Sequence, residues 1–187
     1  MIPSPQECLR IMDHYGMWDN IKAHSLQVAK VALLIGQGIW KKGEDISLPL
    51  VLAGALLHDI GKTEALRKGG DHVEIGKTIC VEQGLKEVAQ IVAEHVRLRS
   101  FCSNGVVQEK EIVYYADKRV NHDQIVSLEE RLDYILSRYA RKDPRLRQAI
   151  VKNFHMCKEV EKKLFTYLDF HPWEVRKLAL KQSILVK

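Results

Sequence analysis

The sequence predicts an all-α protein folded as a single multi-helix bundle. Apolar residues recur at steps of three and four along most of the chain, and no run of alternating strand residues stands out. Residues that favour helix starts precede many of these stretches. The chain has 187 residues, only five prolines and no linker rich in glycine, serine or proline, so residues 1–187 are expected to form one domain.

The first two expected helices lie in the N-terminal part of the chain. Ser4 followed by Pro5 favours a helix start, and Gly16 is a suitable stop. A second helix is expected over residues 19–42. His24 shares one face of this helix with several apolar residues, and we expect it to point inward with Val28, Val31 and Ile35.

Residues 48–57 form an apolar run that is broken only by Gly54, which indicates a helix buried on every side. Pro49 suits its first turn, and the helix is expected to end near residues 59–61, where Gly61 permits the chain to turn. This is the longest apolar run of the chain, and it is too short to span a bilayer. No membrane partner is therefore expected.

The next three expected helices carry polar residues on apolar faces. Asp71 is expected to cap a helix that Gly84 ends. The following helix places His95 on one face with Val88, Ile91 and Val92. Residues 109–121 are also expected to be helical, and there Asp117 is aligned with Val113, Ala116 and Val120.

Two C-terminal helices are expected over about residues 127–170. Ser127 and Glu130 form the pattern of a capping box, which opens a helix to about residue 140. Asp143 and Pro144 start another helix, which carries an apolar stripe to about residue 168. These helices either complete the bundle or form the interface of a homodimer. The tail from residue 172 is basic and has no clear pattern.

The composition indicates a protein of a reducing compartment. The formal net charge of +5 favours anionic partners, but it does not separate a nucleotide from a nucleic acid or a membrane surface. The four cysteines are scattered and form no CxxC pair, so we expect reduced thiols. The N-terminus has no basic region followed by an apolar stretch, so no signal peptide is expected. We therefore expect a cytoplasmic protein.

The inward-facing polar residues carry the strongest functional signal. Burying several imidazoles and carboxylates on apolar helix faces is costly unless they are paired or bind a metal. His58 and Asp59 end the buried run and can both reach one ion, while further ligands must come from other helices. A mixed nitrogen and oxygen set suits one or two divalent ions of Fe, Mn, Co, Ni or Zn rather than calcium. The inward-facing polar residues are His24, His58, Asp59, His72, His95 and Asp117, of which His24 and Asp117 would supply the further ligands.

This pattern resembles the H…HD…D signature of the HD superfamily of metal-dependent phosphohydrolases. Residues 58–62, with the sequence HDIGK, are similar to the HDIG variety of the motif and to its following lysine. The resemblance covers about residues 20–122. It implies that Asp59 bridges two ions where two are bound. It further implies one ion held by His24, His58 and Asp117, and a second held by His72 and His95.

The resemblance implies the hydrolysis of a small phosphate ester, such as a nucleotide or a related monoester or diester, by a metal-activated hydroxide. Asp59 is expected to orient or deprotonate the water, and Lys62 to contact a phosphate beyond the helix end. Other cations near the ligands are expected to bind the same anion, namely Arg97, Arg99 and Lys118. A loop with Arg67 and Lys68 is expected at the rim of the site.

Other readings differ in reaction or partner. Some HD-superfamily members with two irons are oxygenases, and the ligand set alone does not separate them from hydrolases. A non-catalytic regulatory domain would keep the bundle, but it would be expected to lose ligands. Direct nucleic-acid binding is not expected, because the basic residues form no stripe with interleaved aromatic residues. His72 follows His58 by only fourteen positions and no GYP segment is present, so a cyclic di-GMP phosphodiesterase is not expected.

Overall fold

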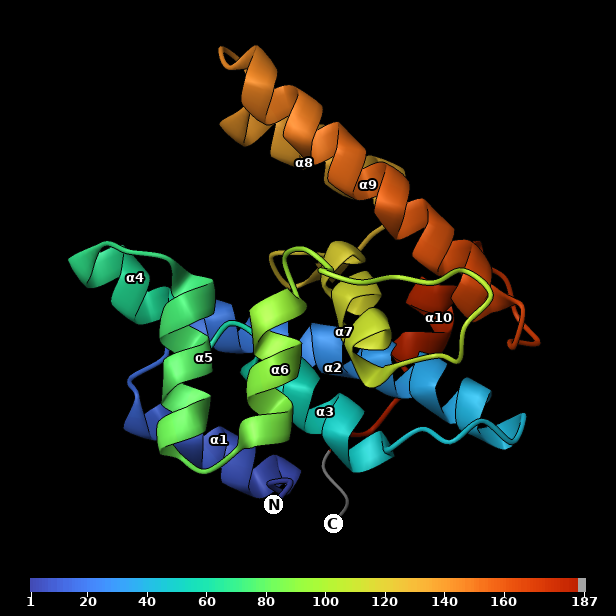
Figure 1. The fold of residues 1–187 in the computed structure, drawn as a ribbon, viewed down its shortest axis with the longest axis horizontal. Helices are drawn as coiled ribbons and strands as arrows, with labels where there is room; N and C mark the ends of the chain where they lie inside the picture. Colours follow the sequence, from blue (N-terminus) through green and yellow to red (C-terminus); the bar gives the residue numbers. More distant parts are fainter. Residues whose placement is uncertain (185–187) are drawn as a thin grey trace.

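The computed structural model describes residues 1–184, and the regular secondary structure of this part of the chain is almost entirely helical (Figure 1). The first helices are α1 (Pro5–His14), α2 (Asp19–Lys41), α3 (Leu48–Leu57), α4 (Lys62–Lys68), α5 (His72–Glu82) and α6 (Lys86–Glu94). They are followed by α7 (Glu109–Lys118), the antiparallel strands β1 (Val120–Asn121) and β2 (Gln124–Ile125), α8 (Leu128–Tyr139), α9 (Pro144–Phe165), η1 (Pro172–Glu174) and α10 (Val175–Ala179). The prediction of an all-α fold is confirmed.

Side-chain caps explain where many of these helices begin. Ser4 accepts a hydrogen bond from the backbone of Glu7, whose carboxylate accepts one from the backbone of Ser4. Ser127 and Glu130 form the same kind of capping box at the start of α8, as the sequence predicts. Single side-chain oxygens cap three other helices, from Ser47, Asp71 and Asp143.

Helix α3 is buried within the bundle, where it packs against α2, α6 and α7 (Figure 1). Its last residues, Ala55, Leu56 and Leu57, have no exposed surface. A Cβ on Gly54 would lie only 2.8 Å from Cδ1 of Ile91, so this glycine lets α6 approach α3 closely. The C-terminal end of α3 is thereby placed deep in the protein, beside α6 and α7.

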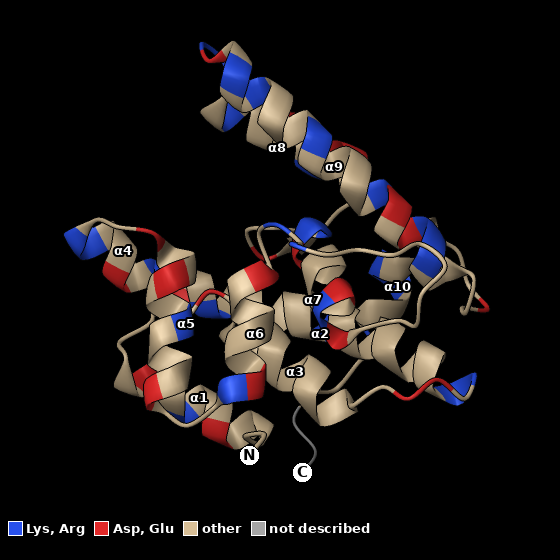
Figure 2. Ribbon diagram, in the orientation of Figure 1, with Lys and Arg blue, Asp and Glu red and all other residues tan. Residues whose placement is uncertain are grey.

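Helices α8 and α9 run antiparallel and extend beyond the rest of the bundle as a hairpin (Figure 1), which we call the arm (residues 128–165). The base of the arm belongs to the core, since Phe154, Cys157 and Leu164 are buried. Leu146, in the first turn of α9, is 40% exposed, and lysines and arginines lie along the arm (Figure 2). The C-terminal helices complete the bundle only in part, and the homodimer interface stays a prediction.

Two expectations about the middle of the chain were wrong. Helix α3 ends at Leu57 and a turn over residues 58–61 follows it. The chain then forms α4, which was not predicted, so Arg67 and Lys68 lie in a helical last turn rather than in a loop. An ion pair four residues apart, between Glu64 and Lys68 at 3.1 Å, supports this short helix.

Two helices are shorter than expected. Helix α7 ends at Lys118 rather than near residue 121, because the chain turns into a hairpin in which Val120 pairs with Ile125. Helix α9 ends at Phe165 rather than near residue 168. Within residues 1–184, no helix combines the length and apolar character needed to cross a bilayer.

Candidate metal centre

The six predicted ligands lie together in the structure, although they come from separate parts of the chain. Two project from within helices, and four lie at or beside helix ends. They are His24 in α2, His58 and Asp59 in the turn after α3, His72 at the start of α5, His95 after α6, and Asp117 in α7. The side chains of five of them are at most 12% exposed, whereas the His72 side chain is 29% exposed.

The first group of ligand atoms comes from His24, His58, Asp59 and Asp117. Nε2 of His58 lies 3.5 Å from Oδ2 of Asp59 and 3.6 Å from Oδ1 of Asp117. Nε2 of His24 lies 3.1 Å from the same Asp117 oxygen and 4.0 Å from Oδ2 of Asp59. Ligand atoms that bond one ion at about 2.0–2.2 Å stand about 3–4 Å apart, so these spacings fit a shared ion.

The second group uses the other oxygen of Asp59. Oδ1 of Asp59 lies 3.6 Å from Nε2 of His72 and 3.6 Å from Nε2 of His95. The ligand atoms of these three residues all lie within 4.8 Å of one another. Asp59 therefore faces both groups, one with each carboxylate oxygen, as a bridging ligand must.

Backbone carbonyl groups orient the buried imidazoles. Nδ1 of His58 lies 2.8 Å from the carbonyl oxygen of Ala55, and Nδ1 of His95 lies 2.7 Å from that of Val92. A ring that donates its Nδ1 proton to a carbonyl presents an unprotonated Nε2 on its other side. Nε2 of His58 is buried and has no hydrogen-bond partner among the described residues. Such an orphaned nitrogen beside two carboxylates fits a metal ligand.

His24 is held in the same way by a residue that the sequence did not single out for this purpose. Its Nδ1 lies 2.8 Å from the carbonyl oxygen of His122, in the hairpin after α7. His122 has φ of 53°, in the left-handed region that few residues adopt. No sequence signal marks this role, because the contact is made by a backbone atom.

Two glycines bring α5 to the metal centre. A Cβ on Gly61 would lie 2.4 Å from the backbone nitrogen of Gly76 and 2.4 Å from the carbonyl oxygen of His72. Gly61 itself has φ of −80° and ψ of −8°, which any residue can adopt. The sequence predicted that Gly61 permits the turn. The structure shows instead that a glycine is needed here for the close approach of α5. This approach places His72 beside Asp59.

The two central carboxylates remain ionised. Burial alone would raise the pKa of Asp59, but the neighbouring imidazoles of His58 and His95 and the charge of Lys62 lower it well below its usual range. Burial would likewise raise the pKa of Asp117, but the charge of Lys118 helps to hold it well below its usual range. The centre therefore keeps two negative charges in a buried place, which favours a bound cation.

The imidazoles respond to the same surroundings. Burial lowers the pKa of His72 to about 4, and it also lowers the pKa of His95, so both rings are neutral at neutral pH. Burial would lower the pKa of His58 too, but Asp59 and Asp117 outweigh it and raise that pKa. The negative field that attracts a proton to Nε2 of His58 attracts a metal ion to the same position.

A cleft of about 320 Å³, which we call the catalytic cleft, adjoins these ligands. One side is formed by ligands and nearby residues, namely Asp59, Lys62, His72, His95, Val96, Asp117 and Lys118. The other side is formed by the arm, through Arg131, Ile135, Tyr139, Ile150, Asn153 and Phe154. The cleft thus joins a polar, charged floor to a wall that is largely apolar.

Three cations line the catalytic cleft. Nζ of Lys62 donates to Oδ2 of Asp59 at 2.7 Å, and Nζ of Lys118 donates to Oδ2 of Asp117 at 2.9 Å. The buried Nε of Arg131 has no hydrogen-bond partner among the described residues. The sequence did not reveal Arg131, because it belongs to no motif and reaches the cleft only through the packing of the arm.

The other predicted cations do not line this cleft. Arg97 lines a neighbouring cavity, and Arg99 lies 3.6 Å from the carboxylate of Glu74 on the surface. The guanidinium group of Arg67 lies 5.7 Å from the ring centre of Trp18. Of the cations that the sequence predicted for substrate binding, the structure brings Lys62 and Lys118 to the cleft.

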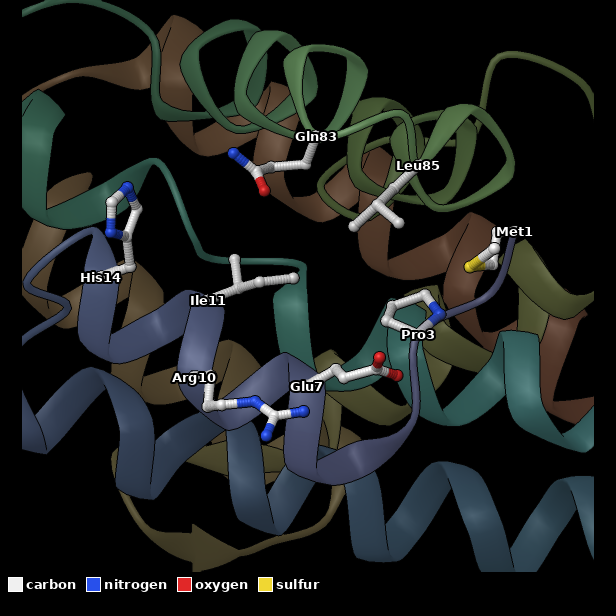
Figure 3. Close-up of a pocket in the computed structure, with 8 residues that line it drawn as sticks. All are labelled: Met1, Pro3, Glu7, Arg10, Ile11, His14, Gln83 and Leu85. Atoms are coloured by element: carbon white, nitrogen blue, oxygen red, sulfur yellow. The ribbon is translucent and has the colours of Figure 1, made fainter.

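A larger cavity, of about 440 Å³, lies next to α1 and the segment that joins α5 to α6 (Figure 3). It is lined by Glu7, Arg10, Ile11 and Leu85 among others, and by none of the six candidate ligands. Its lining includes neither of the two groups of potential metal ligands found among the described residues. The catalytic cleft is therefore the better candidate for chemistry.

Known proteins share this sequence in part. The chain is 33% identical over 146 residues to tRNA (cytidine(56)-2'-O)-methyltransferase of Thermoplasma volcanium. The aligned region covers 71% of this chain and 41% of the methyltransferase. The chain is 24% identical over 148 residues to an uncharacterised protein of Methanocaldococcus jannaschii, covering 72% and 86% of the two chains. It is 42% identical over 72 residues to Ribonuclease Y of a Sulfurovum species, and the aligned region covers 38% of this chain and 13% of the ribonuclease. The chain thus spans about two fifths of the methyltransferase.

The strongest assignment comes from the family comparison. No solved structure gives a significant match to the chain. Residues 21–135, in contrast, match the HD domain. This segment contains all six candidate ligands and also Arg131 of the arm. Since the match covers more than half of the sequence and the ligands converge as its motif requires, the chain belongs to the HD domain family.

Proposed function

We propose that this protein is a metal-dependent phosphohydrolase that cleaves a small phosphate ester, with nucleotides as the first substrate class. The observation that carries the proposal is the position of Asp59. Its two oxygens face two groups of ligand atoms, and these groups adjoin a cleft that also contains three cations. Anionic substrates and metal ions are both favoured by this arrangement.

The donor atoms suit divalent ions of Fe, Mn, Co, Ni or Zn, because imidazole nitrogens and carboxylate oxygens are mixed. One ion would be held by His24, His58, Asp59 and Asp117, and a second by Asp59, His72 and His95. When bound, such ions lower the pKa of water and neutralise charge on phosphoryl oxygens.

Asp59 and Lys62 are the catalytic residues of this proposal. The ionised Asp59 accepts a hydrogen bond from the attacking water and orients it towards phosphorus. An ammonium group has three donors, and Lys62 uses one of them on Asp59, so further donors can bind a phosphoryl oxygen. The water oxygen forms a bond to phosphorus, the ester P–O bond breaks, and the leaving oxygen takes up a proton.

Lys118 and Arg131 are proposed to hold the substrate. Lys118 donates to Asp117 and to the carbonyl oxygen of His95, which leaves its third donor for the substrate phosphate. Arg131, whose Nη1 donates to Asn121 at 2.8 Å, lines the cleft from the arm and supplies a second positive charge for the substrate phosphate. Tyr139, on the same wall, offers an aromatic ring to a nucleobase.

Two further observations support nucleotides and the cellular setting of this proposal. The names of two relatives, a tRNA methyltransferase and a ribonuclease, both concern RNA.

The four cysteines are free, which is typical of a reducing compartment, so we place the protein in the cytoplasm. We also propose that residues 1–187 act as one domain.

The test is an activity panel on the manganese-loaded full chain. Nucleoside monophosphates, a dinucleotide and p-nitrophenyl phosphate are assayed with wild type, Asp59→Ala and the control Asp123→Ala. Asp123 lies in the hairpin and hydrogen-bonds only to Gln124 among the described residues. We expect hydrolysis of at least one nucleotide, a loss of about a thousandfold in Asp59→Ala, and wild-type rates in the control.

Other results would overturn the proposal. Bound iron with oxygen consumption and no phosphate release would indicate an oxygenase. A chain that binds no metal and hydrolyses no ester would indicate a regulatory domain.

A further inference from the structure

A cavity of about 280 Å³, which we call the α9 cavity, lies beside helix α9 and next to the catalytic cleft. It is lined by Arg97, Leu98, Ala149, Lys152, Asn153 and Met156. Two of these residues are cations, and three offer apolar surface. A phosphate attached to a sugar and a base needs the same combination.

Asn153 lines both the α9 cavity and the catalytic cleft. Its Nδ2 donates to the carbonyl oxygen of Val96 at 3.0 Å, and its Oδ1 accepts from the hydroxyl of Tyr114 at 2.9 Å. Val96 lines the cleft, whereas Arg97, the next residue, lines the cavity. The two spaces are therefore neighbours on either side of the Asn153–Val96 hydrogen bond, which is exposed to solvent.

The two cations of the α9 cavity carry charge that the protein does not neutralise. Arg97 and Lys152 are exposed and form no ion pair or hydrogen bond with the rest of residues 1–184. Elsewhere on the same helix, Lys158 lies 2.9 Å from Glu129, and Lys162 lies 2.7 Å from Glu159. Residues 138–152 hold six lysines and arginines but one acidic residue, so this part of the arm favours an anion.

We infer that the α9 cavity binds a second nucleotide unit of a short oligonucleotide whose scissile phosphodiester lies in the catalytic cleft. Arg97 and Lys152 bind the phosphate of this second unit, and Leu98 and Met156 contact its sugar and base. The two spaces together hold roughly 600 Å³, well inside the range of small-molecule sites, whereas the α9 cavity alone lies at its lower limit.

This inference rests on the proposed function and narrows its substrate from phosphate esters in general to oligonucleotides. It also differs from the expectation that nucleic acid is not bound. That expectation depended on the lack of a basic stripe in the sequence. The fold brings Arg97 and Lys152 to one cavity from distant parts of the chain, which no sequence pattern shows.

The reaction needs water as its only co-substrate. The water oxygen forms a bond to the phosphorus in the cleft, and one P–O bond to a nucleoside breaks. The leaving oxygen takes up a proton, so the products are one fragment with a terminal phosphate and one with a free hydroxyl.

The test measures equilibrium binding to the metal-loaded full chain. The main probe is a 5′-phosphorylated adenosine dinucleotide in which a methylene group replaces the bridging ester oxygen that would be cleaved. AMP is the probe with one unit, and tripolyphosphate is the anion without a base. We expect wild type to bind the dinucleotide about tenfold more tightly than either, and the double variant Arg97→Gln, Lys152→Gln to lose this advantage.

Lys162→Gln is the matched control, because Lys162 is exposed on α9 and pairs only with Glu159 among the described residues. It should bind all three probes as wild type does. Equal affinity of wild type for the dinucleotide and AMP would overturn the inference, as would an unchanged double variant. Tripolyphosphate bound as tightly as the dinucleotide would overturn the assignment to nucleotides. The expected binding pattern in a chain that hydrolyses nothing would support this site while contradicting the proposed hydrolase.

Discussion

Gly61 and Gly76 meet through backbone atoms alone, since a Cβ on Gly61 would lie 2.4 Å from the nitrogen of Gly76. This contact joins the turn that carries His58 and Asp59 to the helix that begins with His72. Gly61, the glycine of the HDIGK segment, is thus a packing residue of the candidate metal centre.

Gly61→Ala is expected to force α5 away from the turn. Overpacking of this kind destabilises a protein by about 1–3 kcal/mol, and here it also moves His72 away from Asp59. Thermal unfolding and metal analysis should therefore show lower stability and loss of the second ion. Gly105→Ala is the control, because its new Cβ would meet only Cys102 in a loop that contributes no residue to the ligand groups or to the catalytic cleft. A Gly61→Ala protein with wild-type stability and metal content would refute the packing role.

The two ligand groups should be separable by single substitutions. His72→Gln removes a ligand from the second group alone, so we expect bound metal to fall from about two ions to about one per chain. His24→Gln should remove the ion of the first group in the same way. Metal analysis after gel filtration measures both. Loss of both ions in each variant would show that the groups do not bind independently.

Arg131→Gln should weaken substrate binding. Arg131 is the only arginine among the residues that line the catalytic cleft. Loss of a hydrogen bond between its guanidinium group and the substrate phosphate is expected to lower kcat/KM by about tenfold. Arg131→Lys should recover part of this loss, because the charge is kept and the planar group is not. Arg176→Gln, at an exposed position of α10 outside the arm, is the control. Unchanged kcat/KM in Arg131→Gln would exclude contact with the substrate.

Thiol labelling tests the packing of the helices. Burial raises the pKa of Cys8 and Cys80 to about 12, and it also raises the pKa of Cys157. A raised pKa leaves almost no thiolate at pH 8, so these groups should react slowly, whereas Cys102 is exposed. Mass spectrometry after iodoacetamide treatment should find Cys102 labelled first, and all four cysteines labelled after unfolding. Fast labelling of Cys157 in the native protein would contradict this packing.

The buried positions of His24, His95 and Asp117 could be predicted because helical periodicity records which side chains face the core, whereas His72 was proposed from the resemblance to the HD superfamily. His24 lies on the stripe of Val28 and Val31, and all three are buried as expected. The same periodicity located His95 and Asp117. Most helix starts were also predictable, because residues such as Ser127 cap the backbone locally.

The rest depends on contacts between distant segments. Arg131 reaches the catalytic cleft through the packing of the arm, and Asn153 joins two cavities through contacts with Val96 and Tyr114. Helix α4 was missed because its seven residues are too few to show a period. The role of Gly61 was misjudged because the atoms that require a glycine belong to α5.

In the proposed centre, Asp59 supplies one carboxylate oxygen to each group of ligands. The most direct test is the number of metal ions bound per chain in wild type and in Asp59→Ala, with circular dichroism to verify the helical fold. We predict about two ions in wild type and fewer than about one in the variant, because each group loses an oxygen. An unchanged ion count in a folded Asp59→Ala protein, or the loss of a single ion, would contradict it.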